Sequence, residues 1–156
     1  MSATNHFKSI LALNPLERPA KIVDVFGCEK SWEDRYKLII DWGKELEPIL
    51  EQYKKPEFLV KGCQSSVWLF VELTTDEKCK IHVDSDASIV KGLVALIYLT
   101  YEQVPLSEMN KIDLQFFKEI GLIEHLSLSR ANGLQSMIKT LKMFGIAYAH
   151  QKSQNK

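Results

Sequence analysis

The chain of 156 residues carries 20 Lys and Arg side chains against 20 Asp and Glu, so its formal net charge at neutral pH is zero. This balance excludes the strongly basic field typical of proteins that bind nucleic acid or anionic membranes, and we expect neither as a partner. Apolar residues make up 46% of the chain and charged residues 26%, which predicts one ordinary globular domain with a sizeable core. The longest uninterrupted apolar run, Leu93–Leu99, is far too short to cross a bilayer.

The chain has three cysteines, Cys28, Cys63 and Cys79, and none of them belongs to a CxxC motif. An odd number without that spacing is not a disulfide framework, and free thiols are typical of a reducing compartment. The N-terminus carries no charged segment followed by a long apolar stretch, so we expect no secretory signal and a cytoplasmic protein. Residues 1–20 contain two prolines and are predicted to form a flexible leader.

A first long helix is predicted over residues 31–46, SWEDRYKLIIDWGKEL, because their apolar residues recur at helical spacing. Ser31 is a suitable N-cap, and Asp34 occupies the capping-box position three residues later. Pro48 follows shortly and either ends this helix or opens a new short segment.

Three extended segments are predicted next, at residues 56–63, 65–73 and 79–84. In the second, SSVWLFVEL, successive side chains alternate between two faces from Val67 on, and the third, CKIHVD, alternates throughout, with the periodicity of a strand. The connections are too short to contain crossover helices, so we expect a small three-stranded antiparallel sheet packed against helices. Cys63 would then lie near the turn between the first two extended segments.

The most apolar helix is predicted within residues 85–104, SDASIVKGLVALIYLTYEQV. It begins at Ser85 or Asp86, and Pro105 lies just beyond its end. Because it is apolar on nearly all sides, we expect it to lie at the centre of the domain.

A short helical region follows and stops at Gly121, and Ser129 caps a final helix with one apolar face. One helix, then a sheet, then several helices is the element order of an α+β fold. We expect a single domain over residues 21–150, followed by a disordered tail at residues 151–156.

Cys63 lies in the stretch KGCQSSVW, directly after a glycine and before small polar residues. Such a turn presents its thiol, whereas Cys79 shares a strand face with apolar residues and is predicted to belong to the core. A free cysteine has a pKa of about 8.5, so a reactive thiolate needs help from backbone N–H groups or from a helix N-terminus, such as the one near Asp86. The residues alone leave a reactive thiol and a small apolar filler equally open.

A metal site would have to use Cys63, Cys79, His82 and Asp84. Strand alternation places Cys79 and His82 on opposite faces of the sheet, and the spacing matches no common zinc pattern. We therefore predict no metal site.

A stand-alone thiol hydrolase would need a histidine beside Cys63, and the candidate bases are His82, His125 and His150. Nothing in the sequence pairs any of the three with Cys63.

Arg130 has an unusual position, because it lies at the predicted start of the last helix, where the helix dipole disfavours a cation. It is either a solvated side chain or a partner for a carboxylate, Asp86 or Asp84, or for a docking surface, and the sequence leaves both interpretations open.

Three motifs in a fixed order now resemble one known family. They are GCQSSVWL at residues 62–69, SDASIVKGL at residues 85–93 and HLSLSRANGLQSMI at residues 125–138. Together they are similar to the SufE family of sulfur-acceptor proteins, which includes the CsdE branch. The likeness covers roughly residues 21–143 and includes the first long helix.

The resemblance implies a SufE/IscU-like fold and a function in sulfur transfer. Members of the family take sulfane sulfur from the persulfide of a PLP-dependent SufS-type cysteine desulfurase, which they also stimulate. They pass it on for iron–sulfur cluster assembly by a scaffold such as the SufBCD complex. The acceptor would be Cys63, supported by Gly62, Gln64 and Ser65. The PLP belongs to the desulfurase, so the chain would need no cofactor and would act as an accessory protein.

Asp86 and Arg130 match polar positions of the family motifs and, with His125, are candidates for docking the partner or positioning the thiol. Leu128 stands where a proline is common and Ala131 where a serine is common, which affects the entry into the final helix. A metal-binding cluster scaffold of the IscU type remains the alternative function. It would need bound zinc or iron, whereas a carrier needs only Cys63.

Overall fold

The computed structural model describes residues 1–155. Seven helices and a two-stranded sheet lie in this part of the chain, joined by short 3₁₀ turns. In chain order they are α1 (Ala3–Leu11), α2 (Arg18–Gly27), α3 (Trp32–Lys44), β1 (Val67–Leu73), β2 (Cys79–Ser85), α4 (Ser88–Tyr101), α5 (Phe116–Glu119), α6 (Leu122–His125) and α7 (Leu128–Gln154).

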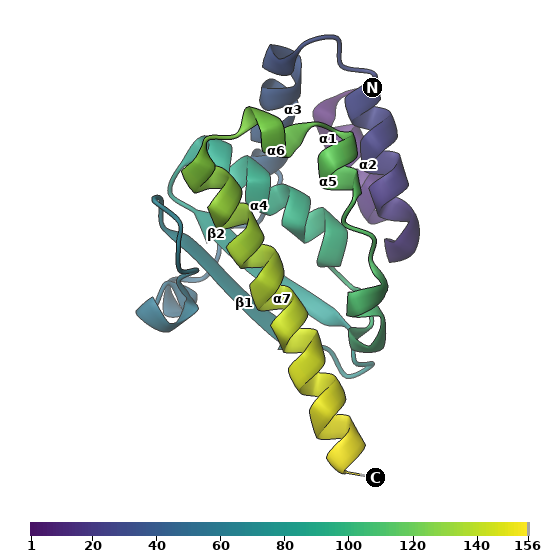
Figure 1. The fold of residues 1–156 in the computed structure, drawn as a ribbon, viewed down its shortest axis with the longest axis vertical. Coiled ribbons are helices and arrows are strands. Elements are labelled where there is room, and N and C mark those ends of the chain that lie inside the picture. Colours follow the sequence, from purple (N-terminus) through teal and green to yellow (C-terminus); the bar gives the residue numbers. More distant parts are fainter. Residues whose placement is uncertain (156) are drawn as a thin grey trace.

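Helix α4 lies at the centre of the fold, as the sequence predicted (Figure 1). It packs against α3, against strand β2 and against α7, and most of its side chains are buried. The helix begins at Ser88 rather than at Ser85 or Asp86, because strand β2 continues to Ser85. None of the helices within residues 1–155 combines the length and the apolar character needed to span a membrane.

The sheet is an antiparallel hairpin in which Val67 pairs with Ser85 and Leu73 pairs with Cys79. The predicted alternation is confirmed, because the β1 and β2 side chains that face α4 are buried, among them Val67, Leu69, Ile81 and Val83. On the opposite face Phe70 stacks on Tyr53, which lies in the segment that follows α3.

The prediction of a strand at residues 56–63 is wrong. Residues 56–58 form a 3₁₀ turn that begins at Pro56, and only Leu59 pairs with β1, through an isolated bridge to Trp68. The chain then bends sharply at Gly62 to return to β1, so the segment is too short to form a ladder. The class α+β stands, with two strands in place of three.

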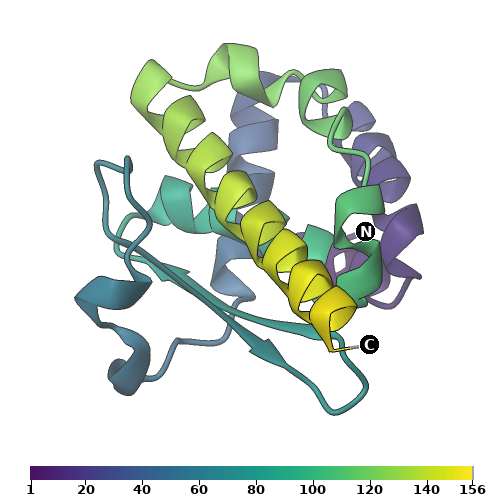
Figure 2. The same cartoon turned by 60° about the horizontal axis from the view of Figure 1, so that its bottom comes forward.

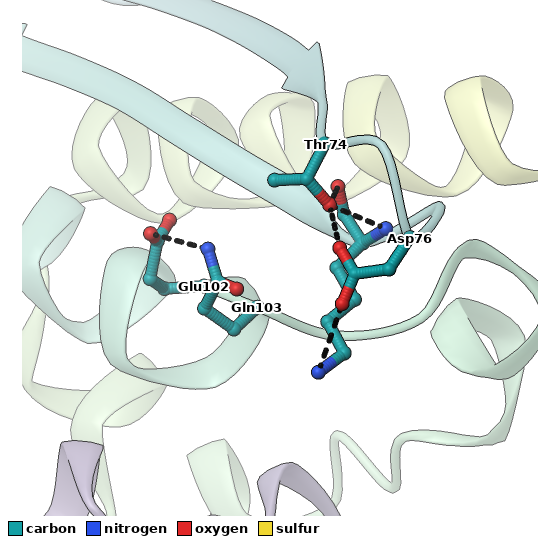
Figure 3. A network of polar contacts seen from close by, with 5 residues as sticks. Thr74, Asp76, Glu102 and Gln103 are labelled. Carbon is teal, nitrogen blue, oxygen red and sulfur yellow. Dashed lines mark hydrogen bonds and ion pairs between the residues drawn. The ribbon is translucent and has the colours of Figure 1, made fainter.

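The turn between the strands is held by the side chain of Thr74 (Figure 3). Its hydroxyl donates to the Asp76 carboxylate at 2.5 Å and accepts from the backbone N–H of Lys78 at 3.0 Å. The Lys78 ammonium lies 3.3 Å from the same carboxylate. These contacts hold a tight turn in which Glu77 has a positive φ of 61°.

The N-terminal segment is not the flexible leader that the sequence predicted. Residues 3–11 form α1, in which Phe7 and Ile10 are buried on one helical face. The ring of Phe7 stacks on that of Tyr98 in α4, with a centroid distance of 6.2 Å. The prediction gave weight to the prolines and missed the apolar pair at positions i and i+3, which is enough to dock a short helix.

Arg18 links the N-terminal segment around α1 to helix α4 through hydrogen bonds. Its guanidinium is buried and donates to four backbone carbonyls, two at or just after the end of α1 and two at the C-terminal end of α4: Leu11, Leu13, Leu99 and Glu102. A planar group with five donors suits this set of acceptors. Residues 1–18 are therefore part of the folded body.

Helix α7 crosses α4 and extends beyond the body of the molecule at its C-terminal end (Figure 1). In the turned view its C-terminal end lies near the turn between β1 and β2 (Figure 2). It begins at Leu128, one residue before the predicted cap, because the hydroxyl of Ser127 accepts from the backbone N–H of Arg130. The predicted disordered tail begins at residue 151, but residues 151–154 continue the helix, and the Lys152 ammonium lies 2.7 Å from the Glu77 carboxylate. Residue 156 lies outside the described residues.

Candidate functional site

Cys63 lies in the turn that precedes strand β1, and Gly62 gives this turn its shape. Gly62 has a φ of +88°, in the left-handed region that favours glycine. A Cβ atom added to Gly62 would lie 3.2 Å from the hydroxyl oxygen of Ser136 in α7, so the turn also passes close to that helix. The bend directs Cys63 toward α7 and leaves its side chain half-buried.

The thiol faces a small cavity of about 60 Å³ between the turn, helix α4 and the first turns of α7. The turn contributes Cys63, Gln64 and Ser65, and the helices contribute Val90, Leu93, Ser129, Arg130, Gly133 and Met137. Apolar side chains from two helices therefore lie beside the sulfur, while a cation and small polar groups line the remainder. A cavity lined by apolar, polar and cationic side chains suits a group that is kept from water and also binds an anionic partner.

Burial raises the pKa of the Cys63 thiol above its ordinary value. The sequence suggested that backbone N–H groups or a helix N-terminus would promote the thiolate. In the part of the chain that the structure describes, burial is the cause that shifts this pKa, so the protonated thiol is favoured in the resting position. Exposure of the sulfur to water would remove this penalty on the thiolate.

Three of the predicted site residues, Gln64, Ser65 and Arg130, are brought together with Cys63 around the cavity. The first two follow the cysteine directly in the turn. Arg130 comes from the first turn of α7, about 70 positions later in the chain, so its place beside the cysteine depends on the tertiary fold.

The guanidinium of Arg130 has no ion-pair partner among residues 1–155. The carboxylates considered for it are engaged elsewhere, because Asp84 lies 3.3 Å from the Lys91 ammonium and Asp86 binds a backbone N–H group. The guanidinium at the edge of the cavity is thus free to bind an incoming anionic group.

Asp86 does not line the cavity but fixes the end of the cysteine turn. Its carboxylate accepts a hydrogen bond from the backbone N–H of Ser66 at 3.1 Å, and its own N–H donates to the carbonyl of Ser66 at 3.3 Å. The hydroxyl of Ser85 donates to the same carbonyl at 2.9 Å. The residues after β2 thereby hold the end of the turn three residues beyond Cys63.

His125 is not brought to the cysteine. Its ring stacks on the indole of Trp32 at a centroid distance of 3.6 Å, and its Nδ1 lies 2.9 Å from the carbonyl oxygen of Gly121. His82 pairs with Glu72 on the outer face of the sheet, and His150 lies near the end of α7. The residues that line the cavity include none of the three histidines considered for a hydrolase.

The four side chains considered as metal ligands are not gathered either. Cys79 is buried, with its sulfur 3.4 Å from that of Met109, which confirms its place in the core. His82 lies on the other face of β2, as strand alternation predicted. Over residues 1–155 there is no group of three or more His, Cys, Asp or Glu side chains that could hold a metal ion.

The apolar part of the site was not predicted from the sequence. Val90, Leu93, Met137 and Gly133 were interpreted only as parts of helices or motifs. The signal was present in α7, because Ser129, Gly133 and Met137 follow one another at intervals of four and so share a helical face. What the sequence did not indicate was that the cysteine turn lies against this face.

Residues 20–144 match the SufE family model, described as an Fe-S metabolism associated domain. An uncharacterized SufE-like protein of Rhizobium etli is 43% identical over 126 residues, which are 78% of this chain and 85% of that protein. A hypothetical protein from Thermus thermophilus, known from a solution structure, has a similar fold with a TM-score of 0.69. The match covers 84% of this chain and 95% of that one, and at 16% identity it bears on the fold alone.

Proposed function

The chain belongs to the SufE family, and from this premise we propose that it accepts sulfane sulfur on Cys63 from the persulfide of a SufS-type cysteine desulfurase. The observation that carries the proposal is the placement of the Cys63 thiol on a glycine-shaped turn, facing a cavity whose edge holds Arg130. A turn of this kind can leave the cavity and enter the active site of another protein, which a cysteine within a strand such as Cys79 cannot do.

The transfer is a thiol–persulfide exchange. The Cys63 thiolate attacks the outer sulfur of the desulfurase persulfide, and a new S–S bond forms to the Cys63 sulfur. The S–S bond of the desulfurase persulfide breaks, and the desulfurase cysteine leaves as a thiolate. That thiolate takes up one proton in exchange for the proton that Cys63 lost. Sulfur passes from one cysteine to the other with no net oxidation or reduction.

The cavity supports two stages of this reaction. In the resting protein the apolar neighbours of Cys63 keep its thiol protonated, and so they protect it from oxidation. Arg130 can pair with an anionic group of the partner, or with the persulfide anion, when the turn opens. Gln64 and Ser65 supply further polar groups at the edge of the cavity.

We further propose the remaining parts of the pathway. The chain stimulates the desulfurase by removing its persulfide sulfur, delivers that sulfur to a SufBCD-type scaffold for iron–sulfur cluster assembly, and does so in the cytoplasm. The PLP of the reaction belongs to the desulfurase, and this chain acts through Cys63 without a cofactor of its own. It is an accessory sulfur carrier rather than a stand-alone enzyme.

The test is intact-protein mass spectrometry after incubation with a SufS-type desulfurase and cysteine, followed by peptide mapping. One added sulfur atom, removable by a reductant and located on Cys63, is the expected result. The Cys63→Ser variant should remain folded and gain no sulfur. The Cys28→Ser variant is the matched control, because Cys28 is an exposed thiol outside the cavity, and it should load normally.

Absence of added sulfur with an active desulfurase would overturn the carrier proposal. The metal-binding scaffold would then be the function to examine, by measuring bound zinc or iron. Loss of the fold in Cys63→Ser would also count against a cysteine that acts from a mobile turn.

A further inference from the structure

We propose that Gly133 is the positioning residue of the Cys63 thiol: the space left by its missing side chain is the resting place of the cysteine sulfur against helix α7. A Cβ atom added to Gly133 would lie 2.9 Å from the Cys63 sulfur, closer than real Cβ contacts allow. The role of this contact in sulfur transfer rests on the proposed function, whereas the contact between Gly133 and the sulfur is independent of that function.

The backbone of Gly133 gives no other reason for a glycine. The residue lies inside α7, where its backbone is helical and where glycine is less favourable than alanine. Its φ is not positive, unlike that of Gly62. A glycine at this position is therefore explained by what approaches it from outside the helix.

Cys63 alone accounts for that approach. The three atoms nearest to a Cβ built on Gly133 are the Sγ, Cβ and Cα atoms of Cys63, at 2.9, 3.7 and 3.8 Å. Only the first distance is too short, since the other two are ordinary van der Waals contacts. The sulfur atom is thus the one group that a side chain at position 133 would displace.

Displacement of the sulfur would change its surroundings in a definite direction. In its resting place the thiol faces a cavity that Val90, Leu93 and Met137 also line, and it is partly removed from water. A methyl group at position 133 takes part of this space, so the sulfur must move away from α7, by rotation of the Cys63 side chain or by a shift of the turn. The sulfur then becomes more accessible and forms a thiolate more readily.

The first experiment measures alkylation of Cys63 by iodoacetamide as a function of pH, in protein that carries Cys28→Ser. Gly133→Ala is expected to raise the rate at neutral pH by about threefold or more and to move the midpoint of the pH profile to lower pH. Gly27→Ala is the matched control, because nothing lies within 4 Å of a Cβ at Gly27, and its profile should equal that of the parent. Equal profiles for Gly133→Ala and the parent would overturn the proposal.

The second experiment is a double-mutant cycle on thermal stability. Gly133→Ala is expected to raise the Tm in the Cys63→Ala background, because the sulfur is gone and alanine is the better helix former. In the parent the change in Tm should be less favourable, because the sulfur must move to make room for the methyl group. An equal change of Tm in both backgrounds would show no coupling between Gly133 and Cys63 and would overturn the proposal.

The cycle still tests the proposal if the Gly133→Ala variant does not fold. If Gly133→Ala is unfolded but Cys63→Ala/Gly133→Ala is folded, the sulfur is the cause and the proposal stands. If both are unfolded, the proposal fails.

Neither measurement uses a desulfurase, so a chain that gains no persulfide would refute the proposed function and leave this contact intact. Normal persulfide loading without coupling between Gly133 and Cys63 would refute the contact alone.

Discussion

The carboxylate of Asp86 accepts a hydrogen bond from the backbone N–H of Ser66 at 3.1 Å, and this contact ties the end of the cysteine turn to the residues after β2. We expect Asp86→Ala to loosen the turn, because the N–H of Ser66 then loses its side-chain acceptor. Alkylation of Cys63 should become a few times faster, with a loss of unfolding free energy of about 1 kcal/mol or less.

Asp86→Asn is the matched control for this prediction, since its amide oxygen can accept the same hydrogen bond. It should alkylate at nearly the parental rate. Equal acceleration in Asp86→Ala and Asp86→Asn would instead indicate that the charge of Asp86, and not its hydrogen bond, restrains the turn.

Arg130 is expected to act on the partner and not on the fold. It has no ion pair among residues 1–155, so Arg130→Ala should leave the midpoint of urea unfolding almost unchanged. The rate of persulfide transfer from the desulfurase should fall by about tenfold, which corresponds to loss of one charge-assisted hydrogen bond. Arg130→Lys keeps the charge without the planar donor pair and should recover part of that rate. An unchanged transfer rate in Arg130→Ala would remove Arg130 from the site.

Substitution of Arg18 is expected to lower the stability of the fold without changing the reactivity of Cys63. Its buried guanidinium satisfies backbone carbonyls at the ends of α1 and α4, and Arg18→Met would leave them without donors inside the core. We expect a loss of unfolding free energy of about 2–4 kcal/mol, measured by urea denaturation. Alkylation of Cys63 in the folded variant should stay unchanged. A loss below about 1 kcal/mol would mean that water replaces the guanidinium without difficulty.

The three thiols should react in an order set by burial. Cys28 is exposed, Cys63 is half-buried and Cys79 is buried, so we expect alkylation to proceed in that sequence. Cys79 should react only on unfolding, because burial raises its pKa to about 12. Peptide mapping over time measures the order, and early labelling of Cys79 in folded protein would contradict it.

The raised pKa of Cys79 also predicts how stability depends on pH. The folded state holds the proton of this thiol more tightly than the unfolded state does. Its contribution to the unfolding free energy is therefore complete below the ordinary pKa of a cysteine thiol and is lost as the pH rises from there toward 12. Cys79→Ala should flatten the stability curve above pH 9, although it lowers stability at neutral pH by leaving a small cavity.

Local pattern was sufficient for the elements that have a strong period. The alternation of VWLFVEL and CKIHVD predicted both real strands, and the continuous apolar run predicted the central position of α4. The pattern failed where one residue changes the course of the chain. Gly62 turns the first predicted extended segment, residues 56–63, away from the sheet after a single bridge at Leu59, and no period reports that bend.

The sequence singled out the cysteine of the candidate site but did not predict its surroundings. Cys63 was identified by a motif, and Arg130 by its unfavourable position at a helix start. The packing of the cysteine turn on α7 joins residues about 70 positions apart, and it depends on how two helices and a hairpin assemble. For the same reason the sequence could not show that Asp84, one of the carboxylates considered for Arg130, has Lys91 as its neighbour instead.

Helix α1 lies outside the stretch that matches the family model, yet it completes the core of this chain. The ring of Phe7 covers Tyr98, and Tyr98 lies on the same helix that lines the cysteine cavity with Val90 and Leu93. A family member without such a segment must cover that position of α4 with different side chains. The residues that match a family model thus need not include the whole hydrophobic core, and in this protein the core extends further toward the N-terminus, to helix α1.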